Sequence, residues 1–194
     1  MSTIRSVCVY CGSSGQVADT YKQAAHDLGR RIGAAGLRLV YGGGRVGLMG
    51  ITADAALAEG GEVVGIIPEH IQALEVDHTG LTELHVVDSM HTRKAMMVSR
   101  SDAFVILPGG LGTLDEAFEI ITWRQLRLHD KPIIIVDVDG YWAPLRALLT
   151  HIRETGFGRM EIERLYTFVD RVEDVLPALA VAPVPTVEAH VARL

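Results

Sequence analysis

The chain alternates between short apolar runs and longer segments with helical periodicity, and this alternation limits the fold more than any other feature. Strands are predicted at residues 6–11, 37–41, 62–67, 83–87, 103–107, 133–136 and 166–169. Helices are predicted at residues 17–35, 47–59, 91–100, 114–128, 142–155 and 172–180. Such alternation is typical of a parallel sheet covered by helices on both faces. We therefore predict an α/β fold with a Rossmann-like, doubly wound parallel sheet.

The length of the chain favours one such domain. With 194 residues, 48% of them hydrophobic, it can bury one core and is short for two. We expect a single domain over residues 1–182. Residues 183–194 follow the last predicted helix, begin with Pro183 and Pro185, and are expected to form a flexible C-terminal tail.

Composition argues against two kinds of partner. The net charge of −6 and the absence of a Lys/Arg cluster do not suit a protein that grips nucleic-acid phosphates. No apolar run reaches the roughly 18 residues of a membrane-spanning helix. Residues 1–5 lead directly into a strand rather than into the apolar segment of a signal peptide. A cytoplasmic location is therefore expected, without nucleic acid or membrane as partner.

Metal and redox chemistry are not indicated. Cys8 and Cys11 have CxxC spacing, but they lie in a predicted buried strand, where core packing is the expected role. The eight histidines are scattered and show no metal-ligand spacing. We predict no metal and no cofactor.

Three glycine-rich turns follow predicted strands. They are residues 12–15, which include Ser13 and Ser14, residues 42–47, which include Gly43, and residues 108–113. Ligands of parallel sheets bind outside the carboxyl ends of the strands, where these turns should lie. The three turns are therefore expected to meet at one edge, with Ser13, Ser14 and Gly43 among the ligand contacts.

The turn at residues 108–116 reads PGGLGTLDE and combines an anion site with an acid. Its glycines let backbone N–H groups converge, and the start of the following helix adds positive potential. The expected cradle consists of Gly109, Gly110, Leu111, Gly112 and Thr113. Glu116 follows Thr113 by about one helical turn and should lie close to whatever the cradle holds. This arrangement indicates chemistry on a phosphorylated small molecule.

The turn at residues 42–47 also matches the GxGxxG dinucleotide fingerprint. In that fingerprint an acid about 20 residues further on ends the next strand. Here Glu62 begins a strand and Glu69 lies beyond Pro68. The glycines are better explained by close approach to a phosphate or to a neighbouring helix than by hydride transfer.

Two further sites have more than one interpretation. Arg93 and Lys94 follow a predicted helix cap at Asp88 or Ser89; they form either a solvated basic face or contacts to phosphate and to Glu116. Trp123 lies in the helix after the cradle. It belongs either to the core or to a subunit interface.

Four motifs together resemble the LONELY GUY (LOG) family. They are YGGGxxGLMG at residues 41–50, SMHxRK at 89–94, PGGxGTxxE at 108–116 and TWxQL at 122–126. The resemblance implies hydrolysis of nucleoside 5′-monophosphates, releasing a free base and ribose 5-phosphate. The base would be adenine or an N6-substituted adenine, that is, a cytokinin. It also implies a homodimer.

The same resemblance implies specific roles. Substrate contacts would come from Glu75, Arg93, Lys94, residues 110–116 and Thr122, with Arg93 and Glu116 as the catalytic pair. Two positions depart from the usual pattern: Asp115 stands where the family has Glu, and Arg127 stands where Gly is common. Both departures could alter base preference or the subunit contact.

Two other functions remain to be weighed. Relatives are often labelled lysine decarboxylase-like, but that reaction normally needs a lysine that holds pyridoxal phosphate. Of the three lysines, Lys22, Lys94 and Lys131, only Lys94 is expected near the cradle. The second alternative is a nucleotide sensor or molybdenum-cofactor carrier on the same scaffold. Such a binder has no need for Arg93 and Glu116 together.

Overall fold

The computed structural model describes all residues except 1–3, 73–77, 79, 159–161 and 188–194. The strands are β1 (Ser6–Tyr10), β2 (Arg38–Tyr41), β3 (Val63–Pro68), β4 (Glu83–Val87), β5 (Ala103–Ile106), β6 (Ile133–Val136) and β7 (Thr167–Val169). The α-helices are α1 (Asp19–Ala34), α2 (Gly47–Ala58), α3 (Glu69–Gln72), α4 (Met90–Ser99), α5 (Leu111–Gln125), α6 (Ala143–Glu154) and α7 (Val175–Val181). Short 3₁₀ turns lie at Val138–Gly140, Ile162–Arg164 and Val172–Asp174.

All seven strands form one parallel sheet in the order β4-β3-β2-β1-β5-β6-β7. The chain moves outward from β1 to β4, returns to the other side of β1 with β5, and continues outward to β7. The strand order therefore reverses between β1 and β5. The predicted doubly wound, Rossmann-like fold is confirmed, and its topological switch point lies between these two central strands.

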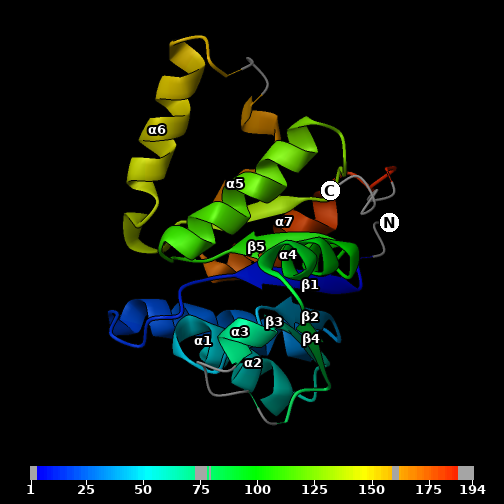
Figure 1. Cartoon of the computed structure of the whole chain (residues 1–194). Coiled ribbons are helices and arrows are strands. Elements are labelled where there is room, and N and C mark those ends of the chain that lie inside the picture. Colours follow the sequence, from blue (N-terminus) through cyan, green and yellow to red (C-terminus); the bar gives the residue numbers. More distant parts are fainter. Residues whose placement is uncertain (1–3, 73–77, 79, 159–161, 188–194) are drawn as a thin grey trace.

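The alternation of side chains along each strand feeds two cores. On β1, Val7 and Val9 join α1, α2 and α7 on one face, whereas Cys8 and Tyr10 join α4, α5 and α6 on the other. Figure 1 shows α1 and α2 on one side of β1 and α4 and α5 on the other. Strands β1, β3, β5 and β6 are buried along their whole length, which explains why they read as continuous apolar runs, whereas the edge strands β4 and β7 are only partly buried.

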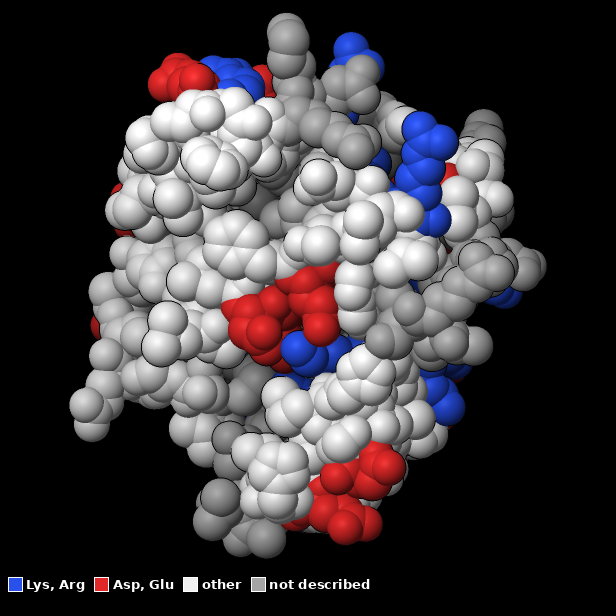
Figure 2. Space-filling model, turned by 45° about the horizontal axis from the view of Figure 1, so that its top comes forward, with Lys and Arg blue, Asp and Glu red and all other residues white. Residues whose placement is uncertain are grey.

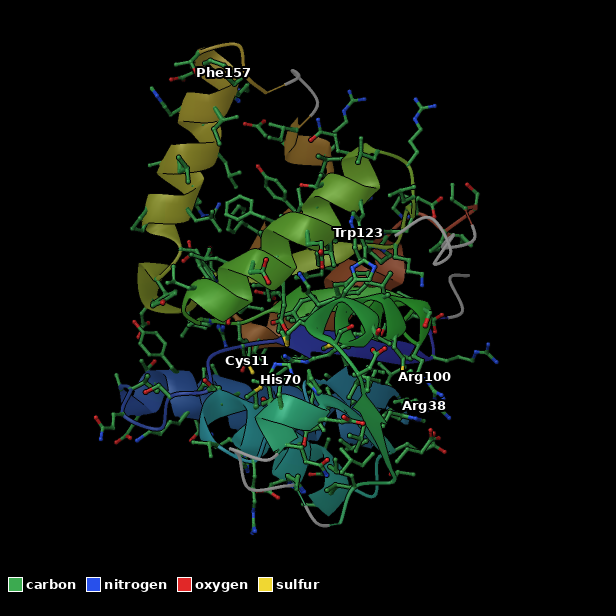
Figure 3. The ribbon with its side chains drawn as sticks, in the orientation of Figure 1. Cys11, Arg38, His70, Arg100, Trp123 and Phe157 are labelled. Carbon is green, nitrogen blue, oxygen red and sulfur yellow. The ribbon has the colours of Figure 1, made fainter. Side chains whose placement is uncertain are left out.

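The carboxyl ends and the amino ends of the parallel strands form two edges of the sheet that carry different side chains. In Figure 3, Cys11 marks the carboxyl end of β1, while Arg38 and Arg100 lie together at the opposite edge. Cys11 and Cys8 are both free and buried, so the expected core role is confirmed. Trp123 is 9% exposed and packs in the same core cluster as Ile120 and Ile121. Of its two possible roles, the structure supports the core.

Helix boundaries differ from the expected ones at the most informative place. The sequence placed a helix at residues 114–128, but α5 begins at Leu111 and ends at Gln125. Gly110 is the extended residue that precedes the helix, so Gly112 and Thr113 belong to the first helical turn rather than to the loop. The short helix α3 was not predicted, since four residues are too few to show a periodicity.

The C-terminal segment is attached to the domain at one point. The backbone N–H and the hydroxyl of Thr186 both donate to Asp130 Oδ2, at 2.7 and 2.9 Å. The flexibility expected for residues 183–194 stays a prediction, and residues 188–194 lie outside the described residues. Among the helices that the structure describes, none has the length and apolar character needed to cross a membrane.

Candidate active site at the switch point

The three glycine-rich turns meet at the carboxyl edge of the sheet, as the sequence predicted. The Gly12 N–H donates to Pro108 O at 3.0 Å, and the Leu48 N–H donates to Gly12 O at 3.0 Å. A Cβ at Gly47 would lie 2.3 Å from the backbone of Ser13. Glycine at this position is what lets the backbones of two turns touch.

A cavity of about 270 Å³ opens where these turns meet. Its polar wall contains Arg93, Glu116 and the first turn of α5, and its apolar wall contains Met49, Ile71 and Met90. The other lining residues are Cys11, Gly12, Ser13, Gly42, Gly110, Leu111, Gly112, Thr113 and Asp115. The cavity thus offers an anion site, an ion pair and an apolar surface side by side.

The start of α5 supplies the anion site. Leu111, Gly112 and Thr113 form its first turn, so their N–H groups have no intrahelical partner and carry the positive end of the helix dipole. A Cβ at Gly109 would lie 2.1 Å from Oγ1 of Thr113. Because glycine has no Cβ, the turn can fold tightly over the Thr113 side chain. From outside, the Tyr141 hydroxyl donates to Gly109 O at 2.7 Å.

Arg93 and Glu116 form an ion pair in the polar wall of the cavity. Arg93 Nη2 lies 3.4 Å from Glu116 Oε1, and the two side chains are 12% and 10% exposed. Helix α4 positions Arg93 one turn from its start, where the Ser89 hydroxyl accepts from Thr92 N and caps the helix. Of the two predicted caps, Ser89 is the one used.

Burial dominates the protonation of Glu116. It raises the pKa of this carboxyl to about 7, although Arg93 favours the ionised form. Asp115 and Glu119 raise the pKa further, and Lys94 opposes them. Many catalytic acids and bases lie in a cleft and have a pKa near neutral pH, as this carboxyl does.

Lys94 does not line the cavity. Its Nζ lies 3.0 Å from Glu119 Oε1 and 3.3 Å from Asp115 Oδ2, both on α5. Figure 2 shows acidic and basic side chains in direct contact at the centre of one face of the molecule. Arg93 and Lys94, although adjacent, therefore face different partners.

The remaining sequence-predicted contacts are distributed as follows. Ser13 and Asp115 line the cavity. Ser14 does not, and its hydroxyl accepts a hydrogen bond from Gln16 N. A Cβ at Gly43 would face Ile66 and Ile67 of β3 rather than the cavity. Thr122 is exposed on α5, six residues beyond Glu116. Glu75 lies outside the described residues.

Sequence reasoning missed the apolar wall. Met49, Ile71 and Met90 come from three separate elements and look like ordinary apolar positions in the sequence. The spacing of Met90 and Arg93 was a usable signal, because residues three apart on a helix are neighbours. Arg93 Nη1 does lie 3.6 Å from Met90 Sδ.

A larger cavity of about 550 Å³ lies at the opposite edge of the sheet. Its Arg38 pairs with Glu62 at 2.8 Å and its Arg100 pairs with Glu83 at 3.1 Å. None of the glycine-rich turns of the switch point reaches it. Within the described part of the chain, no three His, Cys, Asp or Glu side chains are grouped as a metal site.

The fold and the site define a class: doubly wound α/β proteins with a helix-start anion cradle and an arginine–carboxylate pair at the switch point. Residues 49–179 match the family described as possible lysine decarboxylase. The cytokinin riboside 5′-monophosphate phosphoribohydrolase of Rhodococcoides fascians is 51% identical over 80% of this chain and 79% of its own length. The cytokinin riboside 5′-monophosphate phosphoribohydrolase LOG3 of Arabidopsis thaliana is 45% identical over 80% of this chain and 73% of its own length. The chain belongs to the LOG family.

Solved structures share the fold at low identity. The molybdenum cofactor carrier protein of Chlamydomonas reinhardtii superimposes with a TM-score of 0.69 at 19% identity, over 90% of this chain and 95% of that one. The molybdenum cofactor binding protein of Rippkaea orientalis gives 0.69 at 20% identity, over 92% and 98%. At this identity the likeness concerns the scaffold alone.

Proposed function

We propose that this protein hydrolyses the N-glycosidic bond of adenosine 5′-monophosphates, with or without an N6 substituent, and releases the free base and ribose 5-phosphate. It would thus be an N-glycosyl hydrolase that uses water and no cofactor. The observation that carries the proposal is the buried Arg93–Glu116 pair beside the start of α5. The names of the relatives at 45–51% identity support it.

The 5′-phosphate would occupy the cradle. The free N–H groups of Leu111, Gly112 and Thr113 and the dipole of α5 favour a dianion at this point. Binding the phosphate there fixes the sugar beside Glu116, which lies in the next turn of the same helix. Binding energy from a group that does not react is thereby used to orient the group that does.

Glu116 and Arg93 would act on the glycosidic bond. Its cleavage builds positive charge on the sugar and negative charge on the departing base. An ionised Glu116 can stabilise the sugar cation or activate the attacking water. Arg93 is always charged, so it suits a role in orienting Glu116 and donating to the substrate rather than in giving up a proton.

The apolar wall would receive the base. Met49, Ile71 and Met90 offer polarisable side chains that can pack against a purine face. A carrier or sensor could use such a wall as well, but it gains nothing from a carboxyl held in a poorly hydrated position against an arginine. A Schiff-base decarboxylase is not supported, because none of the three lysines lines the cavity.

We also infer a homodimer whose contact lies close to the site. An apolar groove between α5 and α6 is lined by Leu114, Phe118, Tyr141, Trp142, Pro144, Leu145 and Leu148. Leu111, at the cavity mouth on the same helix α5, is 86% exposed. Large exposed apolar side chains in one region favour a protein partner. Light scattering of purified protein should give twice the mass of the chain, and a monomeric mass at micromolar concentration would contradict the inference.

The hydrolase is tested by incubating purified protein with AMP and with adenosine and measuring free adenine. We expect release from AMP and little from adenosine, because the nucleoside lacks the phosphate anchor. Equal rates would refute the anchor. Glu116→Gln should lower the turnover number on the order of 10²–10⁴-fold while AMP binding survives; persistent turnover would remove Glu116 from the mechanism.

A further inference from the structure

Lys94 has a position that a substrate contact would not have. It follows Arg93 directly on α4, yet its ammonium group faces α5 and bridges two carboxylates there, Glu119 at 3.0 Å and Asp115 at 3.3 Å. The side chain is 14% exposed and lies outside the cavity lining. Its hydrogen-bonding capacity is thus directed at the protein rather than at the ligand.

The partners of Lys94 are the acidic neighbours of Glu116. Asp115 precedes Glu116 directly, and Glu119 follows by three residues, on the adjacent turn of the helix. From α4, the cations facing this group are Arg93 and Lys94. Cys8 and Tyr10 on β1, and Cys11 directly after it, also interact with Glu116. Burial raises the pKa of all three, so they remain neutral at physiological pH. Three carboxylates are therefore balanced by two cations. The side chains of Glu116 and Glu119 are mostly buried, at 10% and 22% exposed, whereas that of Asp115 is 60% exposed.

Lys94 is suited to balance them across the neutral range. Burial acts to lower its pKa, but the hydrogen bond and charge of Glu119, and then those of Asp115, outweigh burial, so the pKa lies above its ordinary value. Without this cation, Asp115 and Glu119 would both repel a negative Glu116. Water would screen the repulsion from Glu119, which is 22% exposed, less than that from Asp115, which is 60% exposed. This repulsion would destabilise the ionised form of Glu116, which is the form that the proposed reaction uses.

We propose that Lys94 is a positioning residue for the hydrolysis: its ammonium group ties α4 to α5 beside the Arg93–Glu116 pair and shields Glu116 from Asp115 and Glu119. This role rests on the proposed function but differs from the substrate contact that the family resemblance implies. The bridge of Lys94 and the pair of Arg93 form two parallel links between the same helices. The Arg93–Glu116 link lines the cavity, and the Lys94 link lies outside the cavity lining and holds the two helices together.

The test compares four single variants and one double variant of the full-length protein over a range of pH, with AMP as substrate. Lys94→Met removes the charge and keeps the aliphatic stem, and Lys94→Arg keeps the charge. Glu119→Gln removes one of the carboxylates that Lys94 neutralises, at a residue outside the cavity lining. Lys22→Met is the matched control, because Lys22 pairs with Asp19 on the exposed part of α1.

For Lys94→Met we expect the acidic limb of kcat/KM to move up by about 0.5–1 pH unit, with KM for AMP within about twofold of the unmodified protein at high pH. Lys94→Arg should restore the original limb. Glu119→Gln should move it down, and Lys94→Met with Glu119→Gln should bring it back. Lys22→Met should change nothing. A rise in KM of more than about tenfold with an unmoved limb would make Lys94 a substrate contact and overturn the proposal.

A second measurement separates this proposal from the proposed function. The carboxyl carbon of Glu116 can be followed by ¹³C NMR in protein labelled at glutamate, with Glu116→Gln to assign the signal. The midpoint of its titration should shift as the limb does, even if the protein releases no base from AMP. An unshifted midpoint in Lys94→Met refutes the shielding role. If Lys94→Met does not fold, Lys94→Gln, which is also neutral, takes its place in the same titration.

Discussion

Gly42 and Arg93 lie in direct contact, and a side chain at position 42 would displace the Arg93 guanidinium. A Cβ at position 42 would lie 2.0 Å from Arg93 Nη2 and 3.3 Å from Met49 Sδ. The Arg93 guanidinium therefore packs against the backbone of the glycine turn after β2 and, from there, pairs with Glu116. The backbone of this turn therefore helps to set the position of the arginine, together with the side chains of Glu116 and Met90.

Gly42→Ala should therefore inactivate the enzyme without unfolding it. The added methyl group would push the guanidinium away from Glu116, and we expect adenine release from AMP to fall by about 100-fold or more, since small displacements of a catalytic group have effects of that size. Gly15→Ala on the neighbouring turn is the control, because a Cβ there meets nothing within 4 Å. Equal activity of the two variants in a steady-state assay would show that Arg93 tolerates displacement.

Glu116 should make the protein less stable at high pH than at low pH. Its folded-state pKa of about 7 lies above the value near 4.5 in the unfolded chain, so the folded state holds the proton more tightly. The free energy of unfolding contributed by this group therefore falls as pH rises from about 4.5 to about 7, and stays low above that.

The matching prediction concerns Glu116→Gln, which cannot ionise. The variant should gain up to about 3 kcal/mol in the free energy of unfolding at pH 8 and gain little at pH 4. Urea denaturation at the two pH values measures the difference. A gain of equal size at both would mean that burial of the charge is not its source.

Much of the fold could be predicted from the sequence because it depends on repeated local patterns. Seven apolar runs predicted the seven strands, and their parallel direction followed from the helical segments between them; the order of the strands was not predicted. The first helix was predicted to end at residue 35; it ends at Ala34, and Gly36 closes it with a φ of 66°. These features are set by residue type and spacing within about 15 residues.

What could not be predicted depends on contacts between distant segments. Lys94 and Arg93 look alike in the sequence, but the charges of α5 separate them in space. Gly43 and Gly42 are adjacent, yet one faces β3 and the other faces Arg93. The apolar wall of Met49, Ile71 and Met90 exists only once three elements come together. No local pattern carries this information.

Tyr141 should affect substrate binding more than turnover. Its hydroxyl donates to Gly109 O at 2.7 Å, and its ring packs edge-on against Tyr21 and Trp142, so it holds the cradle from outside. In Tyr141→Phe the packing remains and one hydrogen bond is lost, which corresponds to about 0.5–1.5 kcal/mol. We expect KM for AMP to rise by about two- to tenfold with kcat nearly unchanged. A loss confined to kcat would place Tyr141 in the chemical step instead.

Arg127 carries a strain that glycine would remove. It follows α5 with a φ of 59°, and Leu128 N donates to Trp123 O at 2.9 Å, which is the hydrogen bond of a Schellman motif. A side chain in this left-handed region costs about 1 kcal/mol, and glycine avoids that cost while losing more entropy on folding. Arg127→Gly should therefore raise the free energy of unfolding by about 0.5–1 kcal/mol, and Arg127→Ala, which keeps the Cβ, should not. Thermal denaturation of the two variants tests this, and adenine release should stay unchanged because Arg127 does not line the cavity. Equal melting temperatures would show that the turn after α5 holds an arginine without strain.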